Sequence, residues 1–366
     1  MVTERTPIDA SPLSNALVVA AGTAIVLLGL TVGTRVLADG DGTALRRAAR
    51  ASVLGWLAWI IPAMLVAPDL GPALLVLATA LSGLASVVVT GIAHRGGVGR
   101  DTVTVYALLV SATVFTPVAI ATLSETSGLL TANFGIVDIA GTLATVVATG
   151  CAGLVAIVLG RGTGSRPATP VPTAVPTGVP TGVLVGAWVL VIAWYAGMEL
   201  QVNAATPVML ASAVLAPAAS AFVWVLVQRM NRSRAPGGAA LGVLCGLAAA
   251  GPGSGVLTPV SAAVAGGIAA LVCASVGYPL LRRGRRPIWL PIIALVGGGG
   301  VGTVLVGVLA ERSGILYTGQ PEQLAGQFVS TLLVAGYALA ASTASWWFAR
   351  RLTPSRPRAA SGGAGS

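Results

Sequence analysis

The chain has 366 residues, of which 55% are hydrophobic and only 9% are charged. A soluble globular domain carries about 25% charged residues, so this composition excludes a soluble enzyme of this size. All of the 21 basic residues are Arg, and they exceed the 11 acidic residues by ten. Such an excess would favour a nucleic-acid partner only on a soluble domain with a basic face. We therefore expect neither a nucleic-acid partner nor enzymatic activity.

Long apolar runs recur along the whole chain, and about 20 apolar residues are enough for a helix to cross a bilayer. In chain order the eleven runs are 15–38, 51–67, 71–93, 102–123, 136–160, 183–200, 207–228, 238–257, 259–281, 288–310 and 325–349. The sequence thus predicts an all-α polytopic membrane protein with about eleven transmembrane helices.

The Arg residues predict the orientation, because basic residues are retained in cytoplasmic loops. All but two of the 21 lie on one side of the predicted spans, from Arg35 and Arg46 to Arg356 and Arg358. The opposite side carries Arg5, Arg312 and the acids Glu4, Asp9, Asp69, Glu125, Asp138, Glu199, Glu311 and Glu322. With an odd number of spans, the N-terminus is predicted outside and the C-terminus in the cytoplasm. The predicted location is the cytoplasmic (plasma) membrane, with membrane lipid around the Arg loops.

A Pro/Thr/Gly-rich stretch divides the chain into two halves of five spans, and halves with an odd number of spans must be inverted relative to each other. Gly150 and Gly153 end the first half, and Gly299 and Gly302 end the second at the same offset. Small residues at this spacing let helices approach closely, and the general Gly richness of membrane helices is the less favoured alternative explanation. The predicted parts are an outer N-terminus 1–14, halves 15–160 and 183–310, a cytoplasmic linker 161–182, an outer loop with the last helix 311–349, and a cytoplasmic tail 350–366.

Four segments of the chain carry a resemblance to a known family, and they are 114–119, 134–161, 238–273 and 313–327. In that order they resemble the fourth helix, the fifth helix, the eighth and ninth helices with their intervening Pro/Gly turn, and the segment before the last helix of the ammonium transporter (Amt/Mep/Rh) family. The resemblance implies eleven helices with the N-terminus outside, two inverted five-helix halves and an extra last helix. It also implies a homotrimer, ammonia or ammonium as the solute, and no cofactor or metal.

The resemblance can be carried to single positions of the transport pathway. The family's Asp at the start of the fifth helix matches Asp138, and the position of the His eight residues later holds Val146. The second family His falls on Leu295. The two Phe of the outer gate fall on Ala80 and Gly197, the Trp of the outer site on Ala121, and its Ser on Gln201. Among these positions Asp138 alone keeps the family residue.

The chain's single His, His94, lies beside Arg95 in a predicted cytoplasmic loop, so two imidazoles cannot meet within one pore. Paired His would offer hydrogen bonds and a proton route, whereas Val146 and Leu295 offer neither. A cation at the bilayer centre must be solvated by protein groups or lose its charge. Such a pore suits a small neutral molecule such as ammonia better than proton-coupled ammonium.

Two polar features have alternative interpretations. Asp138 either attracts cations or accepts hydrogen bonds from a helix N-terminus, and the second interpretation is favoured. Trp194, Tyr195, Glu199 and Gln201 gather near the outer end of the sixth span. They either form a cation site with aromatic faces or belong to an interfacial aromatic belt, and the belt is favoured.

The sequence therefore predicts an ammonium-transporter-like channel, with a solute pathway between the inverted halves and without a His pair. Two alternatives stay open at this point. A non-conducting sensor or subunit of a mixed oligomer would explain the loss of the permeation residues, and an apolar channel for dissolved gas would explain the apolar pore.

Overall fold

The computed structural model describes residues 12–37, 43–124, 128–160, 181–233 and 237–353, and these residues contain helices and turns but no strands. Eight helical segments there are long and apolar enough to cross a membrane. They are α1 (Pro12–Val36), α2 (Ala44–Val66), α3 (Pro72–Gly96), the continuous α4 (Arg100–Val110), η1 (Ser111–Phe115) and α5 (Thr116–Leu123), then α9 (Thr206–Met230), α11 (Pro259–Arg282), α12 (Trp289–Leu309) and α14 (Glu322–Leu352).

The other three predicted spans are shorter apolar helices. They are η2 (Leu143–Ala148) continued by α7 (Thr149–Leu159), α8 (Thr181–Met198), and α10 (Gly238–Ala250). Every predicted apolar run thus contains a helix. The predicted linker lies outside the described residues apart from its last two, and so do nearly all of the predicted N-terminal segment and most of the tail.

The predicted helices 136–160 and 238–257 are wrong at one end each, because 136–141 and 251–257 form turns. Gly141 and Gly255 there have φ angles of +66° and +87°, which only Gly adopts freely. The two turns bond to each other, since the amide of Ile139 donates to the Pro252 carbonyl (3.2 Å) and that of Ala140 to the Gly251 carbonyl (3.3 Å). Non-helical backbone is tolerated at membrane depth when protein satisfies it in this way.

Hydropathy also missed four local features. The short helices α6 (Leu129–Phe134) and α13 (Ile315–Thr318) lie in the loops before η2 and α14 and are too short to give an apolar run. The segments η1 and η2 are π-helical turns within longer helices, a geometry that is frequent at functional sites. Next to each, a hydroxyl bonds five residues back: Thr116 to the Ser111 carbonyl (2.8 Å) and Thr149 to the Ala144 carbonyl (3.2 Å).

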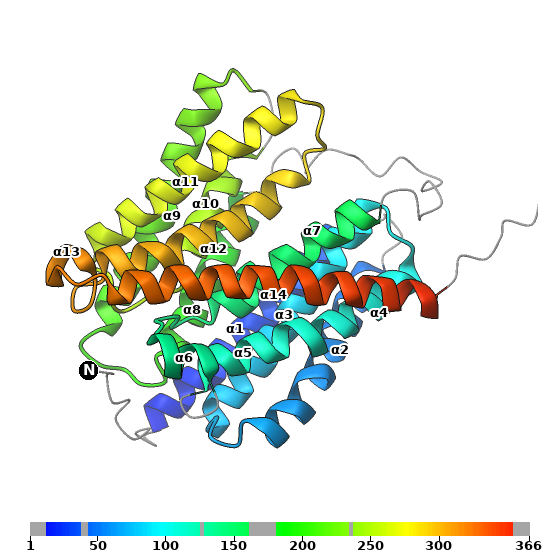
Figure 1. Ribbon diagram of the computed structural model, residues 1–366, viewed down its shortest axis with the longest axis horizontal. Coiled ribbons are helices and arrows are strands. Elements are labelled where there is room, and N and C mark those ends of the chain that lie inside the picture. The colour runs from blue at the N-terminus through cyan, green and yellow to red at the C-terminus, as the bar shows by residue number, and fades with distance from the viewer. Residues whose placement is uncertain (1–11, 38–42, 125–127, 161–180, 234–236, 354–366) are drawn as a thin grey trace, which may run out of the picture.

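The long helix α14 runs across the bundle, with α9 to α12 on one side and α2 to α5 on the other (Figure 1). Hydroxyl pairs join it to the first half, since Thr113 meets Ser345 at 2.9 Å and Thr102 meets Thr353 at 2.7 Å. Near its start the Gln327 amide donates to the Val137 carbonyl at 2.9 Å. The last helix therefore fastens both groups of helices together.

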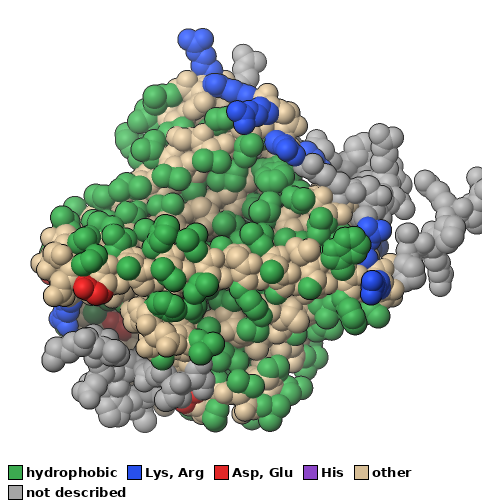
Figure 2. Space-filling view, in the orientation of Figure 1, with side chains coloured by type: hydrophobic (Ala, Val, Ile, Leu, Met, Phe, Trp, Pro, Cys, Tyr) green, Lys and Arg blue, Asp and Glu red, His purple; other side chains and the backbone are tan. Residues whose placement is uncertain are grey.

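Basic and acidic side chains lie at opposite ends of the helices. Figure 2 shows most of the basic side chains along the top and right of the molecule, and acidic atoms at the left and lower left beside one further basic group. Hydrogen bonds connect the loops at the Arg end: Arg95 donates to the Arg35 carbonyl (2.8 Å), and Arg286 donates to the Gly96 carbonyl (3.3 Å). At the acidic end Ser124 donates to Asp69 at 2.6 Å. This separation is the one on which the predicted orientation depends, and the orientation itself stays a prediction.

Candidate functional site

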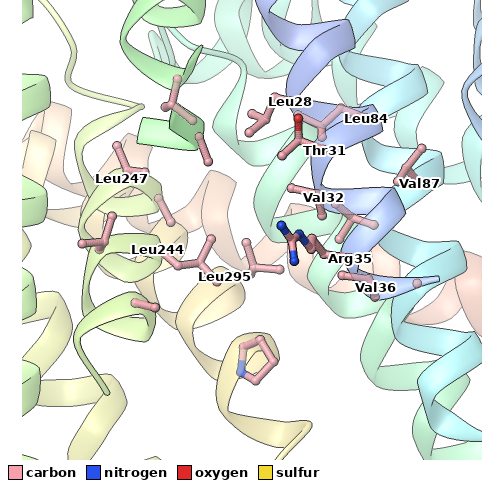
Figure 3. A pocket seen from close by; sticks show the side chains of 18 of the residues that line it. Leu28, Thr31, Val32, Arg35, Val36, Leu84, Val87, Leu244, Leu247 and Leu295 are labelled. Atoms are coloured by element: carbon pink, nitrogen blue, oxygen red, sulfur yellow. The ribbon is translucent and has the colours of Figure 1, made fainter. Parts of the chain in front are cut away.

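A cavity of about 1000 Å³ lies between the two groups of five helices. The first group contributes α1, α3 and η2 to its wall, and the second contributes α8, α10 and α12. Figure 3 shows side chains from both groups facing each other across it, with Leu28 and Val32 of α1 opposite Leu244 and Leu247 of α10. The wall is mostly aliphatic, so the cavity is a largely apolar space within the helical bundle.

One end of the cavity, which we call the closed end, is formed by buried residues. They are Thr145, Trp194, Tyr195, Leu247 and Ala248. The Tyr195 hydroxyl donates to the Leu247 carbonyl, and the Trp194 ring packs edge-on against Tyr195 with their centroids 5.3 Å apart. These contacts tie α8 to α10 and close the space on the acidic side.

Two polar atoms at the closed end have no hydrogen-bond partner within the described part of the chain. They are Nε1 of Trp194 and Oγ1 of Thr145, whose side chains are 4% and 5% exposed. A buried polar group without a partner costs about 1–3 kcal/mol. Unpaired donors and acceptors beside a cavity are therefore where a small polar molecule would be stabilised.

The other end, which we call the Arg end, is formed by Arg35, Arg95 and Arg286. Arg35 lies in the last turn of α1, Arg95 in the last turn of α3, and Arg286 in the loop before α12. Arg35 and Arg286 are exposed, so the cavity opens at this end. Among the residues that the structure describes, no Asp or Glu lines the cavity.

Val146 and Leu295, at the positions of the family's two His, both line this cavity. Val146 is on η2 and Leu295 is on α12, and glycines bring these segments together. A Cβ on Gly150 would be 3.4 Å from the Leu295 Cβ, and one on Gly299 would be 3.4 Å from Cγ1 of Val146. The structure thus brings the two positions to one site, but it offers hydrocarbon there in place of imidazole.

Asp138 lies just before η2, is 7% exposed, and caps the N-terminus of that segment. Its carboxylate accepts the amide of Thr142 at 2.7 Å and the amide of Leu143 at 2.8 Å. A carboxylate at a helix N-terminus satisfies free amides and complements the helix dipole. The arrangement matches the interpretation of Asp138 as a cap, the one that the sequence favoured.

The remaining pathway positions lie elsewhere. Ala80 lines a separate hollow of about 460 Å³ between α1, α2 and α3. Gly197 faces α1, where a Cβ would be 1.9 Å from that of Ala21. Ala121 is partly buried in α5, and Gln201 is partly buried in the turn after α8. The structure does not bring these four to the cavity that holds Val146 and Leu295.

Glu199 follows the end of α8 and fixes the loop to α9. Its carboxylate accepts the hydroxyl of Thr206 at 2.8 Å. Partial burial raises the pKa of Glu199, and the hydrogen bonds from Thr206 and Asn203 oppose this rise. Trp194 and Tyr195 instead line the cavity, so the contacts of the described residues do not bring the four together into one cation site.

His94 lies in the last turn of α3 and is partly exposed at the Arg side, away from Val146 and Leu295. Over the described ranges, no three His, Cys, Asp or Glu side chains come close enough to hold a metal ion.

Sequence reasoning missed Thr145 and Arg35 as cavity residues. Leu28, Val32 and Arg35 recur at spacings that put them on one face of a helix. This periodicity could have shown that Arg35 shares a face with apolar lining residues. Thr145 gave a weaker signal, since it differs from other membrane Thr only by its place next to Val146.

The chain is similar to known proteins in both sequence and fold. The profile of the Ammonium Transporter Family matches residues 69–354. No curated protein matches the sequence. Among solved structures, Mep2 of Candida albicans is similar with a TM-score of 0.78 at 15% identity, covering 93% of this chain and 85% of that one.

Two further structures show the same fold. A protein described as a sensor Amt protein matches with a TM-score of 0.75 at 17% identity, covering 93% of this chain and 94% of that one. Mep2 of Saccharomyces cerevisiae matches with a TM-score of 0.74 at 17% identity, covering 94% of this chain and 86% of that one. With the family profile spanning most of the chain and the apolar helices described above, the protein is a multi-pass membrane protein that belongs to the Ammonium Transporter Family.

Proposed function

We propose that this protein is a channel that passes a small neutral solute, ammonia first, through the cavity between its two halves. The observation that carries the proposal is that Val146 and Leu295 line one apolar cavity between the helices of the two halves. The chain is proposed to act as a homotrimer of eleven-helix subunits in the cytoplasmic membrane, with the N-terminus outside.

The electrostatics of the cavity favour a neutral solute over a cation. An ion loses its hydration in an apolar space, and a charge at the bilayer centre is very costly. In addition, the guanidinium groups of Arg35, Arg95 and Arg286 line the Arg end, and their positive charge disfavours a cation there. Ammonia avoids both costs because it carries no charge.

The unpaired polar atoms at the closed end form a proposed binding site for ammonia. Trp194 Nε1 donates a hydrogen bond, so it suits the nitrogen lone pair, and Thr145 Oγ1 accepts or donates. Passage beyond this point requires Trp194 and Tyr195 to move, because both are buried and close the cavity on the acidic side.

Flux of ammonia and methylammonium into vesicles that contain the purified protein tests the proposal. We expect flux above that of empty vesicles, and we expect Leu295→Trp to lower it, because a larger side chain opposite Val146 narrows the proposed route. The matched control is Leu332→Trp on α14, where the Leu is 57% exposed on the bundle surface and its replacement leaves the cavity unchanged. Absence of flux for any small amine would refute the proposal.

A non-conducting sensor is the second candidate, and the closed end favours it. Trp194 and Tyr195 fill the route, and one of the similar structures is described as a sensor Amt protein. A sensor would show a change in tryptophan fluorescence when ammonium is added but no flux. A channel for dissolved gas is separated from both by stopped-flow measurement of carbon dioxide entry into the same vesicles.

A further inference from the structure

The cavity is much larger than ammonia requires. Its volume is about 1000 Å³, whereas a water molecule, which is similar in size to ammonia, occupies about 30 Å³ in the liquid. Pockets of about 300–1000 Å³ hold drug-sized ligands. The cavity is therefore at the upper end of the range for a single organic ligand.

The wall determines which ligand body would fit. Between the two ends, aliphatic side chains from both groups of helices face the space, including Leu28, Val32, Leu84, Val87, Leu244 and Leu295. Removing a methylene group from water into such surroundings is worth about 0.8 kcal/mol. The aliphatic lining therefore favours a ligand with a hydrocarbon chain.

The Arg end determines the ligand's head group. Arg95 and Arg286 are held in place by hydrogen bonds to backbone carbonyls. Arg35 is different, because no described residue pairs with its guanidinium, which points from α1 across the cavity toward Leu295 (Figure 3). A carboxylate matches this cationic rim, and guanidinium groups bind carboxylates in bidentate geometry.

We propose that the cavity binds the anion of a single-chain fatty acid, with its carboxylate at Arg35 and its hydrocarbon chain between α1, α3 and α10. The ligand would enter from the Arg end, where the lining is exposed, and its chain would run toward Val146. Binding does not depend on conduction, but a bound fatty acid would occupy the route proposed for ammonia and block it.

The test is retention of radiolabelled palmitate by the purified full-length protein in an uncharged detergent, with hexadecanol as the neutral analogue of equal chain length. We expect palmitate to bind more tightly than hexadecanol. Arg35→Gln should weaken palmitate binding about five- to tenfold, the usual worth of one Arg near an anionic lipid, and leave hexadecanol unchanged. Arg312→Gln is the matched control, since Arg312 is exposed on the acidic side.

A second set of variants locates the binding site. Leu295→Trp and, independently, Val32→Trp should each weaken binding of both probes, because the larger ring occupies part of the space proposed for the chain, while Leu332→Trp should not. Two positions on different helices keep the test valid if one variant fails to fold. Palmitate binding as tight as that of wild type in either folded Trp variant of the cavity would place the ligand outside the cavity and overturn the proposal, as would equal palmitate binding by wild type and Arg35→Gln.

The two proposals fail separately. Binding is measured in detergent without any flux, so loss of palmitate binding leaves the vesicle result untouched. Conversely, if the protein binds palmitate but passes no amine, the fatty-acid proposal stands and the channel proposal is refuted.

Discussion

Gly150 of α7 and Gly299 of α12 occupy reciprocal positions at the centre of the molecule. A Cβ on Gly150 would be 2.5 Å from Cγ2 of Val296 on α12, and a Cβ on Gly299 would be 2.8 Å from Cγ2 of Val147 on η2. Each of the two helices thus approaches the other at a point where neither tolerates a side chain.

The next glycines repeat the relationship within each half. A Cβ on Gly153 would be 2.7 Å from Ile92 of α3, and one on Gly302 would be 2.3 Å from the Ala249 carbonyl of α10. The fifth helix of each half therefore packs on the third helix of its own half and on the fifth of the other. This pattern is the one that an inverted repeat would produce.

Gly302→Ala is expected to destabilise the protein. The added methyl would meet the Ala249 carbonyl at 2.3 Å and its Cα at 2.5 Å, so α12 must move away from α10. Overpacking of this kind costs about 1–3 kcal/mol, and thermal unfolding of the purified protein should occur at a lower temperature. Gly336→Ala is the control, since nothing lies within 4 Å of a Cβ there. An unchanged unfolding temperature for Gly302→Ala would contradict the prediction, because it would mean that α12 can move away from α10 without loss of stability.

Replacement of Asp138 separates its role as a cap from an electrostatic one. Asp138→Ala leaves the buried amides of Thr142 and Leu143 without acceptors, at a cost of about 1–3 kcal/mol each. Asp138→Asn keeps one acceptor and should lie between Ala and wild type in thermal stability. If the cap is the main role, amine flux should follow stability in the two variants. A stable Asp138→Asn protein with no flux would instead indicate that the negative charge itself is needed.

The double variant Val146→His, Leu295→His should make flux depend on pH. Both positions line one cavity, and imidazole gains a charge between about pH 8 and pH 5. A cationic imidazole donates a charge-assisted hydrogen bond to the lone pair of ammonia and would hold the solute in the route, so flux per unit of neutral amine should fall as pH falls. Wild-type flux, expressed in the same way, should stay flat. Flux in the double variant that is equally flat would mean that the two side chains do not face the route.

Trp194→Phe tests the proposed ammonia-binding site at the closed end. Phe keeps an aromatic ring against Tyr195 but removes the indole N–H, which has no partner among the described residues. The loss of one neutral hydrogen bond to the nitrogen lone pair should raise the KM for neutral methylamine about two- to tenfold, without loss of thermal stability. Trp188→Phe is a useful comparison, because its indole donates to the Ala213 carbonyl at 2.8 Å and its loss should affect stability instead. An unchanged KM for Trp194→Phe would exclude the indole from solute binding.

Hydropathy was sufficient to place a helix in every predicted span, because burial of about 20 apolar residues in lipid dominates the energetics of such segments. Hydropathy did not separate the turns at 136–141 and 251–257 from the helices that they adjoin, although the Gly and Pro residues of 251–255 are typical of a turn. Their shape depends on hydrogen bonds between Ile139 and Pro252 and between Ala140 and Gly251, which join residues far apart in the chain.

The candidate site was predictable in part. The alignment placed Val146 and Leu295 in one pathway, and both line the same cavity. Arg35 was interpreted only as a topology signal, because a sequence gives the side of the membrane but not the direction of a side chain. The partnerless state of Trp194 Nε1 depends on the packing of α8 against its neighbours, which no local pattern encodes.

The paired turns also bear on the order of biosynthesis. The amides of Ile139 and Ala140 find their acceptors in Pro252 and Gly251, more than a hundred residues later in the chain. When the first five helices have been synthesised, the carbonyl groups that accept from these two amides have not yet been made. The first half therefore lacks these two hydrogen bonds until residues 251 and 252 have been synthesised, and we expect a chain cut between residues 160 and 181 to accumulate only when both fragments are made in the same cell.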